Sequence, residues 1–220
     1  MIEAIVFDMD GVLVETESLW DEVRHGLVRD WGGAYPQGTA RAIMGMSSTE
    51  WSAYLERELG VPRPAREISA EVVRRLRIRF AEELPVIPGA VEAVHALSEA
   101  GFAIGLASSS NRELIDDMLE RTGLAATIRV SVSSEEVARG KPAPDVYLAA
   151  TAALGCTPPT CVAVEDSSNG LRAAHAAGLR VIAVPNRDFP PAAEAVALAD
   201  AVVTTTAEVT PELVTSLASR

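Results

Sequence analysis

Two aspartates, Asp8 and Asp10, lie one residue apart where the first apolar stretch of the chain ends, in AIVFDMDG at residues 4–11. Their carboxylates repel each other unless a cation lies between them or one of them holds a proton. A cation is the simpler explanation, and it requires further oxygen ligands from elsewhere in the chain. Side chains of matching chemistry occur where later apolar stretches end or just beyond, namely Ser108, Lys141, Glu165 and Asp166.

Each of these features also has an ordinary structural explanation. Asp10 and Gly11 form a common turn dipeptide, and a serine such as Ser108 often caps a helix. Lys141 can be a solvated loop lysine, and the acidic pair at 165–166 can favour the start of a helix. Four such features in this order, each near the end of a strand, are more informative than any one of them.

The apolar stretches that precede these residues are typical of buried strands. They occupy residues 4–8, 103–108, 128–133, 161–166, 180–184 and, more weakly, 200–205. Amphipathic helical segments alternate with them, which predicts an α/β fold with a Rossmann-like parallel sheet and helices on both faces. Open parallel sheets bind ligands at the carboxyl ends of their strands, where the four features fall.

Residues 16–85 interrupt this alternation with successive helical patterns and no convincing strand. A capping-box candidate, Ser47 with Glu50, opens one of these helices, and Val72, Leu76 and Phe80 recur four residues apart in another. We therefore predict a catalytic core at 1–15 and 86–220, with an inserted helical cap at 16–85. A lid over the strand ends is the functional interpretation, and a packing appendage is the alternative.

The composition limits the classes of partner. The chain has 220 residues, of which 48% are hydrophobic, and its net charge is −12. Such a surface disfavours nucleic acid and anionic membranes, because both attract basic patches. A strand begins almost at the N-terminus and no apolar run approaches membrane-spanning length, so we expect no signal peptide and no membrane partner. The expected protein is cytoplasmic and monomeric.

The four features together resemble the haloacid dehalogenase superfamily, whose pattern is a strand-ending DxD, a strand-ending Ser or Thr, a Lys and an acidic pair. The resemblance covers about residues 1–205. The helical insertion looks like the cap of the subgroup that includes beta-phosphoglucomutase and small phosphosugar and phosphoglycolate phosphatases. DMDGVLVETESLW, GLASSSN, GKPAPDVYL and VEDSSNG are most similar to sugar-phosphate phosphatases such as the 2-deoxyglucose-6-phosphate type. The resemblance implies a Mg²⁺-dependent phosphatase acting on a small phosphorylated metabolite.

The resemblance also implies catalytic roles. Mg²⁺ would be held by Asp8, the Asp10 backbone carbonyl and Asp166, with Glu165 supporting this shell directly or through water. Asp8 would attack phosphorus and form an aspartyl-phosphate. Asp10 would protonate the leaving alcohol and then deprotonate the attacking water, so it must begin protonated.

Phosphate and substrate contacts follow in the same way. Ser108 and Lys141 would bind phosphate oxygens. Backbone N–H groups around Met9, Asp10 and Ser109 would complete the phosphate site. Candidates for substrate selection are Thr16, Trp20, Met44 to Ser48, Ser109, Ser110 and Asn111. Trp20 could instead only pack within the lid, and Asn111 could only cap a helix.

Three alternatives remain open. A mutase of the beta-phosphoglucomutase type has a histidine after the first motif and an arginine in the lid loop, where this chain has Trp20 and Ser48. A 2-haloacid dehalogenase would leave Asp10 and the acidic pair at 165–166 unexplained. A non-catalytic phosphoacceptor module, like a response-regulator receiver, needs no large lid.

Overall fold

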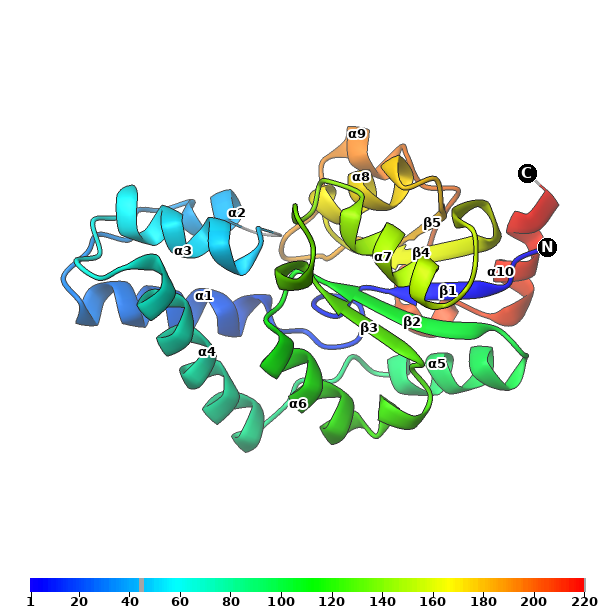
Figure 1. Ribbon diagram of the computed structural model, residues 1–220, viewed down its shortest axis with the longest axis horizontal. Helices are drawn as coiled ribbons and strands as arrows, with labels where there is room; N and C mark the ends of the chain where they lie inside the picture. Colours follow the sequence, from blue (N-terminus) through cyan, green and yellow to red (C-terminus); the bar gives the residue numbers. More distant parts are fainter. Residues whose placement is uncertain (44–45, 220) are drawn as a thin grey trace.

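The computed structural model describes residues 1–43 and 46–219. Within them, six parallel strands form one sheet in the order β3-β2-β1-β4-β5-β6 (Figure 1). The strands are β1 (Ala4–Phe7), β2 (Ala103–Ser108), β3 (Val130–Ser133), β4 (Cys161–Glu165), β5 (Arg180–Ala183) and β6 (Ala201–Val202). The predicted α/β class with a parallel, Rossmann-like sheet is confirmed.

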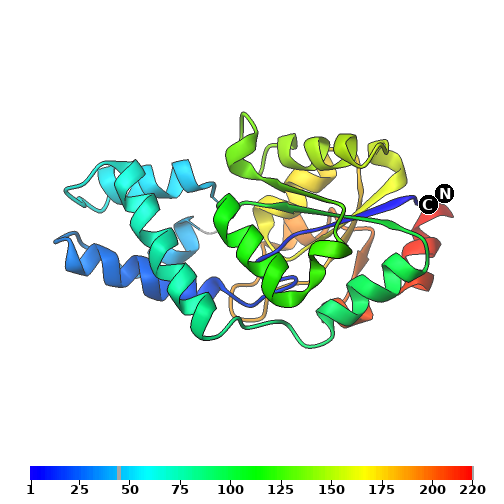
Figure 2. The ribbon, with the colours of Figure 1, turned by 60° about the horizontal axis from the view of Figure 1, so that its bottom comes forward.

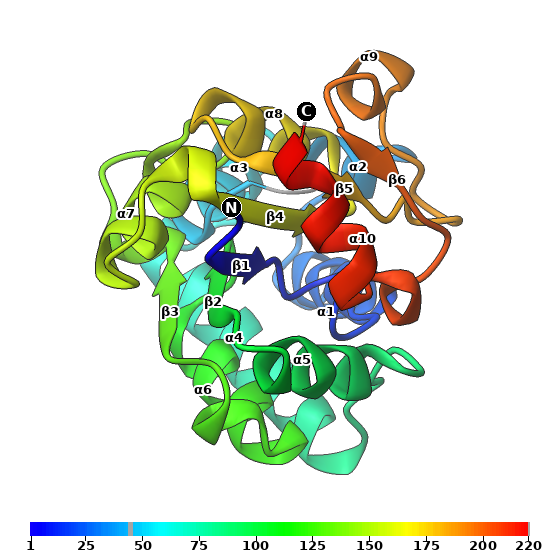
Figure 3. The same cartoon turned by 90° about the vertical axis from the view of Figure 1, so that its right-hand side faces the viewer.

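The side chains of the central strand β1 alternate between two apolar clusters, because successive residues of a strand point to opposite faces. Ile5 and Phe7 pack on one face and Ala4 and Val6 on the other, and all four are fully buried. The first face is covered by α5 (Ala90–Glu99), α6 (Arg112–Thr122) and α10 (Pro211–Ser216). The second is covered by α7 (Asp145–Ala153), α8 (Ser168–Ala176) and α9 (Ala193–Val196), as Figure 3 shows end-on.

Of the five described helices between β1 and β2 in the sequence, the first four have an apolar cluster of their own. They are α1 (Glu17–Asp30), α2 (Thr39–Ile43), α3 (Ser48–Arg57) and α4 (Ala65–Glu82). Trp51, Leu55, Leu76 and Phe80 are among the buried members of this cluster. Figures 1 and 2 show the four inserted helices beside the strands, on the side where β1 ends.

The connections into and out of the inserted helices run side by side. Glu15 N–H donates to the Pro85 carbonyl at 2.8 Å, and Ile87 N–H donates to the Leu13 carbonyl at 2.9 Å. The first connection begins with a turn in which Gly11 has a φ of 76°, a conformation that favours glycine. Both ends of the insertion are therefore fixed next to the end of β1.

Individual elements test the sequence predictions. The strand predicted at 103–108 coincides with β2, and Ser47 and Glu50 form both hydrogen bonds of the predicted capping box. The strand predicted at 128–133 begins only at Val130, and the one at 200–205 is reduced to two residues. Short 3₁₀ helices complete the fold: η1 (Leu124–Ala126), η2 (Ser134–Glu136), η3 (Pro158–Thr160), η4 (Thr206–Glu208) and η5 (Leu217–Ser219). No helix among the described residues has the length and apolarity to span a membrane.

Candidate active site

The two aspartates of the first motif lie at the end of β1, next to the ends of β2 and β4. Asp8 N–H donates to the Val164 carbonyl of β4 at 3.0 Å, which places Asp8 beside Glu165 and Asp166. Gly11 follows in the turn, and a Cβ at this position would lie 2.0 Å from Asp166 Oδ2. Glycine is therefore required here both by its positive φ and by the close approach of Asp166.

Three carboxylates gather at this point with little access to solvent. Asp8, Glu165 and Asp166 each place one oxygen within 4.8 Å of the others, and they are 6%, 0% and 1% exposed. Burial raises the pKa of Asp8 and of Asp166 well above the ordinary value, and repulsion from Glu165 raises both further. Among the described residues, Asp166 Oδ2 is buried without a hydrogen-bond partner. An unpartnered oxygen among repelling carboxylates fits a hard cation with oxygen ligands.

Lys141 supplies a positive charge to this acidic group. Its Nζ lies 2.5 Å from Glu165 Oε1 and 2.9 Å from Asp8 Oδ1, and the residue is 2% exposed. Burial lowers the pKa of Lys141, but Asp8 and Glu165 raise it more, so the net shift is upward and the amine stays charged. One lysine cannot neutralise three carboxylates, so an excess of negative charge remains at the site.

Glu165 is the most completely bonded of the three carboxylates. Besides Lys141, its Oε1 accepts a hydrogen bond of 2.8 Å from the Tyr147 hydroxyl. Its Oε2 accepts from the Asp166 N–H at 3.1 Å and from the Ser167 N–H and hydroxyl at 3.2 Å each. A Cβ at Gly170 would lie 1.8 Å from Glu165 Oε1, so α8 can pack here only with glycine at that position.

Asp10 faces donors from the core and from α1. The Ser110 hydroxyl donates to Asp10 Oδ2 at 2.6 Å, and the Trp20 indole N–H donates to Oδ1 at 3.2 Å. The Thr16 hydroxyl also donates to Oδ1. Trp20 therefore does more than pack, because it holds the carboxylate that the sequence predicted as the acid–base group.

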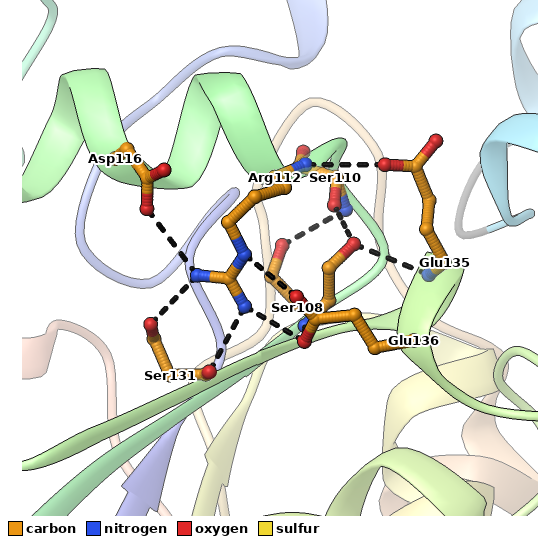
Figure 4. A network of polar contacts seen from close by, with 8 residues as sticks. Ser108, Ser110, Arg112, Asp116, Ser131, Glu135 and Glu136 are labelled. Carbon is orange, nitrogen blue, oxygen red and sulfur yellow. Dashed lines mark hydrogen bonds and ion pairs between the residues drawn. The ribbon is translucent and has the colours of Figure 1, made fainter.

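The loop that follows β2 is held in place by a polar network (Figure 4). Ser108 is fully buried, and its hydroxyl accepts a hydrogen bond of 3.0 Å from the Ser110 N–H. Arg112 crosses the network and donates to Glu136 through Nε and Nη2, at 2.8 Å in both cases. Asn111 occupies the N-cap position of α6 without a side-chain capping bond, and its Nδ2 instead donates to Glu135 Oε1 at 2.7 Å. Asn111 therefore stands at the cap position of α6, but its side chain bonds to Glu135 and not to the helix.

Side chains from the core and from the inserted helices enclose one small cavity of about 40 Å³. The core contributes Asp8, Asp10, Ser109, Ser110, Lys141, Asp166 and Ser167, and the inserted segment contributes Glu17, Trp20, Arg24, Met46 and Trp51. A larger cavity of about 850 Å³ lies between α3, α4 and α6, and none of the carboxylates at the end of β1 lines it. The small cavity is the one that holds the reactive groups.

The family of the chain follows from its match to known proteins. A family model described as haloacid dehalogenase-like hydrolase matches residues 5–184. This chain belongs to that family. Hexitol phosphatase B of Escherichia coli is 34% identical over 189 residues, with 84% of each chain covered. The phosphorylated carbohydrates phosphatase of Thermotoga maritima is 32% identical over 181 residues, with 82% of this chain and 84% of that protein covered.

A solved structure of the same family shares the fold. CbbY from Rhodobacter sphaeroides, determined in complex with phosphate, is 28% identical and has a TM-score of 0.81, with 95% of this chain and 96% of that chain covered. Together with the named phosphatases, these likenesses make the protein a phosphoric monoester hydrolase of the haloacid dehalogenase superfamily.

In this hydrolase, the residues predicted from the sequence that line the small cavity are Asp8, Asp10, Ser109, Lys141 and Asp166, with the substrate candidates Trp20, Met46 and Ser110. Thr16, Ser108 and Glu165 do not line it, but each is hydrogen-bonded to a residue that does. Met9 is buried in the core cluster beneath the site, so only its backbone can face a ligand. Of the segment 44–48, Met44 and Gly45 lie outside the described residues, Ser47 caps α3, and the Ser48 hydroxyl donates to Glu135 Oε1 at 2.8 Å. Asn111 donates to the same oxygen of Glu135, and it does not line the small cavity either.

Several residues of the hydrolase site were missed by the sequence analysis. They are Glu17, Arg24, Trp51, Tyr147 and Ser167. The spacing of Glu17, Trp20 and Arg24 places them on one face of a helix that follows the first motif directly, and that spacing could have identified them. Tyr147 gave no comparable signal, because its contact with Glu165 depends on how α7 packs against the sheet.

Proposed function

We propose that this hydrolase removes phosphate from a small phosphorylated sugar or sugar alcohol, with Mg²⁺ as cofactor and Asp8 as the nucleophile. One observation carries the proposal. The carboxylates of Asp8 and Asp166 lie buried beside Lys141, while Asp10, two residues on, is held separately by Ser110 and Trp20. The opposing roles that the chemistry needs, an ionised nucleophile and a group able to carry a proton, thus have different environments.

The donor set fits Mg²⁺, which prefers oxygen ligands and keeps part of its hydration shell. Asp8 and Asp166 would hold the ion, together with the Asp10 backbone carbonyl. When bound, the ion neutralises charge on the phosphate and on Asp8. Both Glu165 oxygens already accept hydrogen bonds within the protein, so its contribution is to hold Lys141 and the backbone at 166–167 in place.

Asp8 is the carboxylate placed to attack phosphorus. Lys141 Nζ lies 2.9 Å from it, and this charge reduces the repulsion between Asp8 and an incoming phosphate dianion. Phosphoryl transfer depends mainly on positioning and on compensating negative charge, so a fixed lysine and a fixed carboxylate are the required components. Ser110 N–H is already bonded to Ser108, which leaves the Ser108 hydroxyl proton able to donate to a phosphate oxygen.

Asp10 is placed to exchange a proton with the alcohol and then with water. The indole N–H of Trp20 can only donate, so Asp10 Oδ1 must accept and the proton of the neutral acid lies on Oδ2. Serine hydroxyls both donate and accept, so Ser110 can bond to Oδ2 in either protonation state. Asp10 thus acts as the general acid–base through Oδ2.

The inserted helices serve as a cap over this site, in the domain division proposed from the sequence, with the cap at 16–85. A cavity of about 40 Å³ is far smaller than the roughly 300–1,000 Å³ of small-molecule sites, so a sugar phosphate enters only when cap and core move apart. The paired connections at 13–15 and 85–87 are the only covalent links between cap and core among the described residues. Opening about these connections would expose Asp8, and closing would exclude water.

Two relatives support the substrate class, because one is named hexitol phosphatase B and the other phosphorylated carbohydrates phosphatase. Release of phosphate is tested on a panel of hexose, hexitol, pentose and glycerol phosphates and phosphoglycolate. We expect release with Mg²⁺, none with EDTA, and a loss of about 10³-fold or more in Asp8→Asn.

Asp30→Asn, an exposed aspartate on α1, is the matched control and should keep full activity. Conversion of beta-glucose 1-phosphate to glucose 6-phosphate, without net release of phosphate from any compound, would favour the mutase instead. Equal turnover by wild type and Asp8→Asn would refute the proposed nucleophile.

A further inference from the structure

Besides Lys141, the cavity is lined by a second positively charged side chain, and the proposed chemistry does not use it. Arg24, in the middle of α1, lines the cavity together with Asp8, Asp10 and Lys141. Arg24 is only 7% exposed to solvent. Burial lowers the pKa of Arg24 to about 10, so its guanidinium is still fully charged at neutral pH.

Two indole rings stack against the guanidinium of Arg24, and they do not accept hydrogen bonds from its N–H groups. Its Cζ lies 4.3 Å from the ring centroid of Trp20 and 4.8 Å from that of Trp51. Indole rings attract a cation but offer no acceptor for its hydrogen bonds. Among residues 1–43 and 46–219, the guanidinium has no hydrogen-bond or ion-pair partner, and its Nε is buried without one.

Lys141 provides a contrast within the same cavity. Both of its carboxylate partners, Asp8 and Glu165, lie within 2.9 Å of Nζ. Glu17 is the acidic group that acts most strongly on Arg24, but no ion pair joins them. A buried cation without a partner is unfavourable, and a ligand that brings an anion into the cavity would remove that cost.

We infer that Arg24 binds a second anionic group, a carboxylate or a second phosphate, on the alcohol part of the substrate. This inference rests on the proposed function, because it assumes that the phosphate to be cleaved lies at Asp8. Trp20 links the two ends of the site, since its N–H contacts Asp10 and its ring contacts Arg24. A guanidinium pairs with either anion through two parallel hydrogen bonds, which explains arginine at this position.

Matched pairs of compounds test the inference. Sorbitol 6-phosphate and 6-phosphogluconate, and glycerol 3-phosphate and 3-phosphoglycerate, differ by a terminal hydroxymethyl or carboxylate. Fructose 6-phosphate and fructose 1,6-bisphosphate differ by a second phosphate. We expect at least one anionic member to exceed its partner about tenfold or more in kcat/KM, and the pair that responds identifies which anion is bound.

Three variants separate recognition from packing. Arg24→Met keeps the apolar stem and should bring the ratio within the responding pair close to one, while Arg24→Lys should retain part of it. Arg29→Met, an exposed arginine of the same helix, should keep the wild-type ratio. An equal loss of turnover on both members in Arg24→Met, with an unchanged ratio, would show a packing role and overturn the inference. So would a wild-type ratio near one in all three pairs.

Binding of the same compounds to the Asp8→Asn protein tests the inference without any turnover. Calorimetry with the same pairs should show tighter binding of the anionic member, and the added Arg24→Met change should abolish the difference. Absence of phosphate release from every compound, p-nitrophenyl phosphate included, would refute the proposed function alone. Equal affinities within each pair would refute the role of Arg24, whether or not the enzyme turns over.

Discussion

Glu17, Trp20 and Arg24 form one face of α1, with an acid and a base on either side of the indole that contacts Asp10. The two charged residues respond differently to burial. Arg24 stays charged, whereas burial and the nearby Asp10 raise the pKa of Glu17 from 4.5 to about 7. At neutral pH Glu17 is thus close to half-protonated, and its negative charge only partly offsets that of Arg24.

Replacing Glu17 with Gln should therefore stabilise the protein in a pH-dependent way. Between pH 4.5 and 7 the folded state keeps a proton on Glu17 that the unfolded chain releases, so the wild type loses stability as pH rises through this interval. Glutamine does not titrate. Relative to wild type, Glu17→Gln should gain little at pH 4 and about 1–2 kcal/mol at pH 8, a value reduced from the full shift because the side chain is partly exposed.

Urea unfolding at several pH values, with EDTA present so that no cation alters the site, measures this difference. Glu22→Gln, an exposed glutamate on the same helix, provides the control. A difference between Glu17→Gln and wild type that stays constant from pH 4 to pH 8 would show that Glu17 has an ordinary pKa.

At the scale of elements, α3 contacts the core through Glu135, which lies in η2 after β3. Its Oε1 accepts hydrogen bonds from Ser48 of α3 at 2.8 Å and from Asn111 of the core at 2.7 Å. Its Oε2 accepts from the Arg112 N–H at 3.2 Å. One carboxylate thus joins the inserted helices to the loop that carries Ser108 and Ser110.

Ser48→Ala should weaken the closed arrangement of cap and core. A hydrogen bond to a charged group contributes about 1.5–3 kcal/mol, so kcat/KM for the preferred phosphate ester should fall roughly tenfold if closure precedes chemistry. Ser52→Ala is the matched control, because Ser52 lies one turn later on α3 and its hydroxyl donates only to the Thr49 carbonyl of the same helix. Equal kcat/KM in the two variants would show that the Ser48–Glu135 contact does not govern closure.

The same elements show what a sequence can and cannot predict. The strands were found because successive residues such as Ile5 and Val6, which point to opposite faces of the buried sheet, are both apolar. Helix α3 was found because Ser47 and Glu50 are a local capping pattern. The reactive groups followed from their positions at strand ends. The spacing of Arg24 from Glu17 and Trp20 places it on the face of α1 that follows the first motif, but spacing does not predict that its guanidinium packs against the ring of Trp51.

At the scale of the whole molecule, the protein carries a net charge of −12, so any divalent cation will have some non-specific affinity for its surface. The buried carboxylates add a specific binding site for a cation. Asp8, Glu165 and Asp166 share a single lysine, and Asp166 Oδ2 has no hydrogen-bond partner among the described residues. Without a cation this group destabilises the fold, because repulsion between buried carboxylates is relieved when the chain unfolds.

Mg²⁺ should therefore stabilise the whole fold through this one site. At a concentration of 100 times the dissociation constant, binding adds about 2.7 kcal/mol to the free energy of unfolding. For a chain of 220 residues this corresponds to a rise in Tm of roughly 5–10 °C. Scanning calorimetry with EDTA, and then with increasing Mg²⁺ at constant ionic strength, measures the rise.

Asp166→Asn separates the site from the surface charge. The amide removes one buried negative charge, so this variant should be at least as stable as wild type in EDTA and should gain little from Mg²⁺. Asp30→Asn changes the net charge equally at an exposed position and should keep the wild-type response. Equal gains in all three proteins would mean that Mg²⁺ acts on the surface charge, and the buried carboxylates would then need another explanation than a cation.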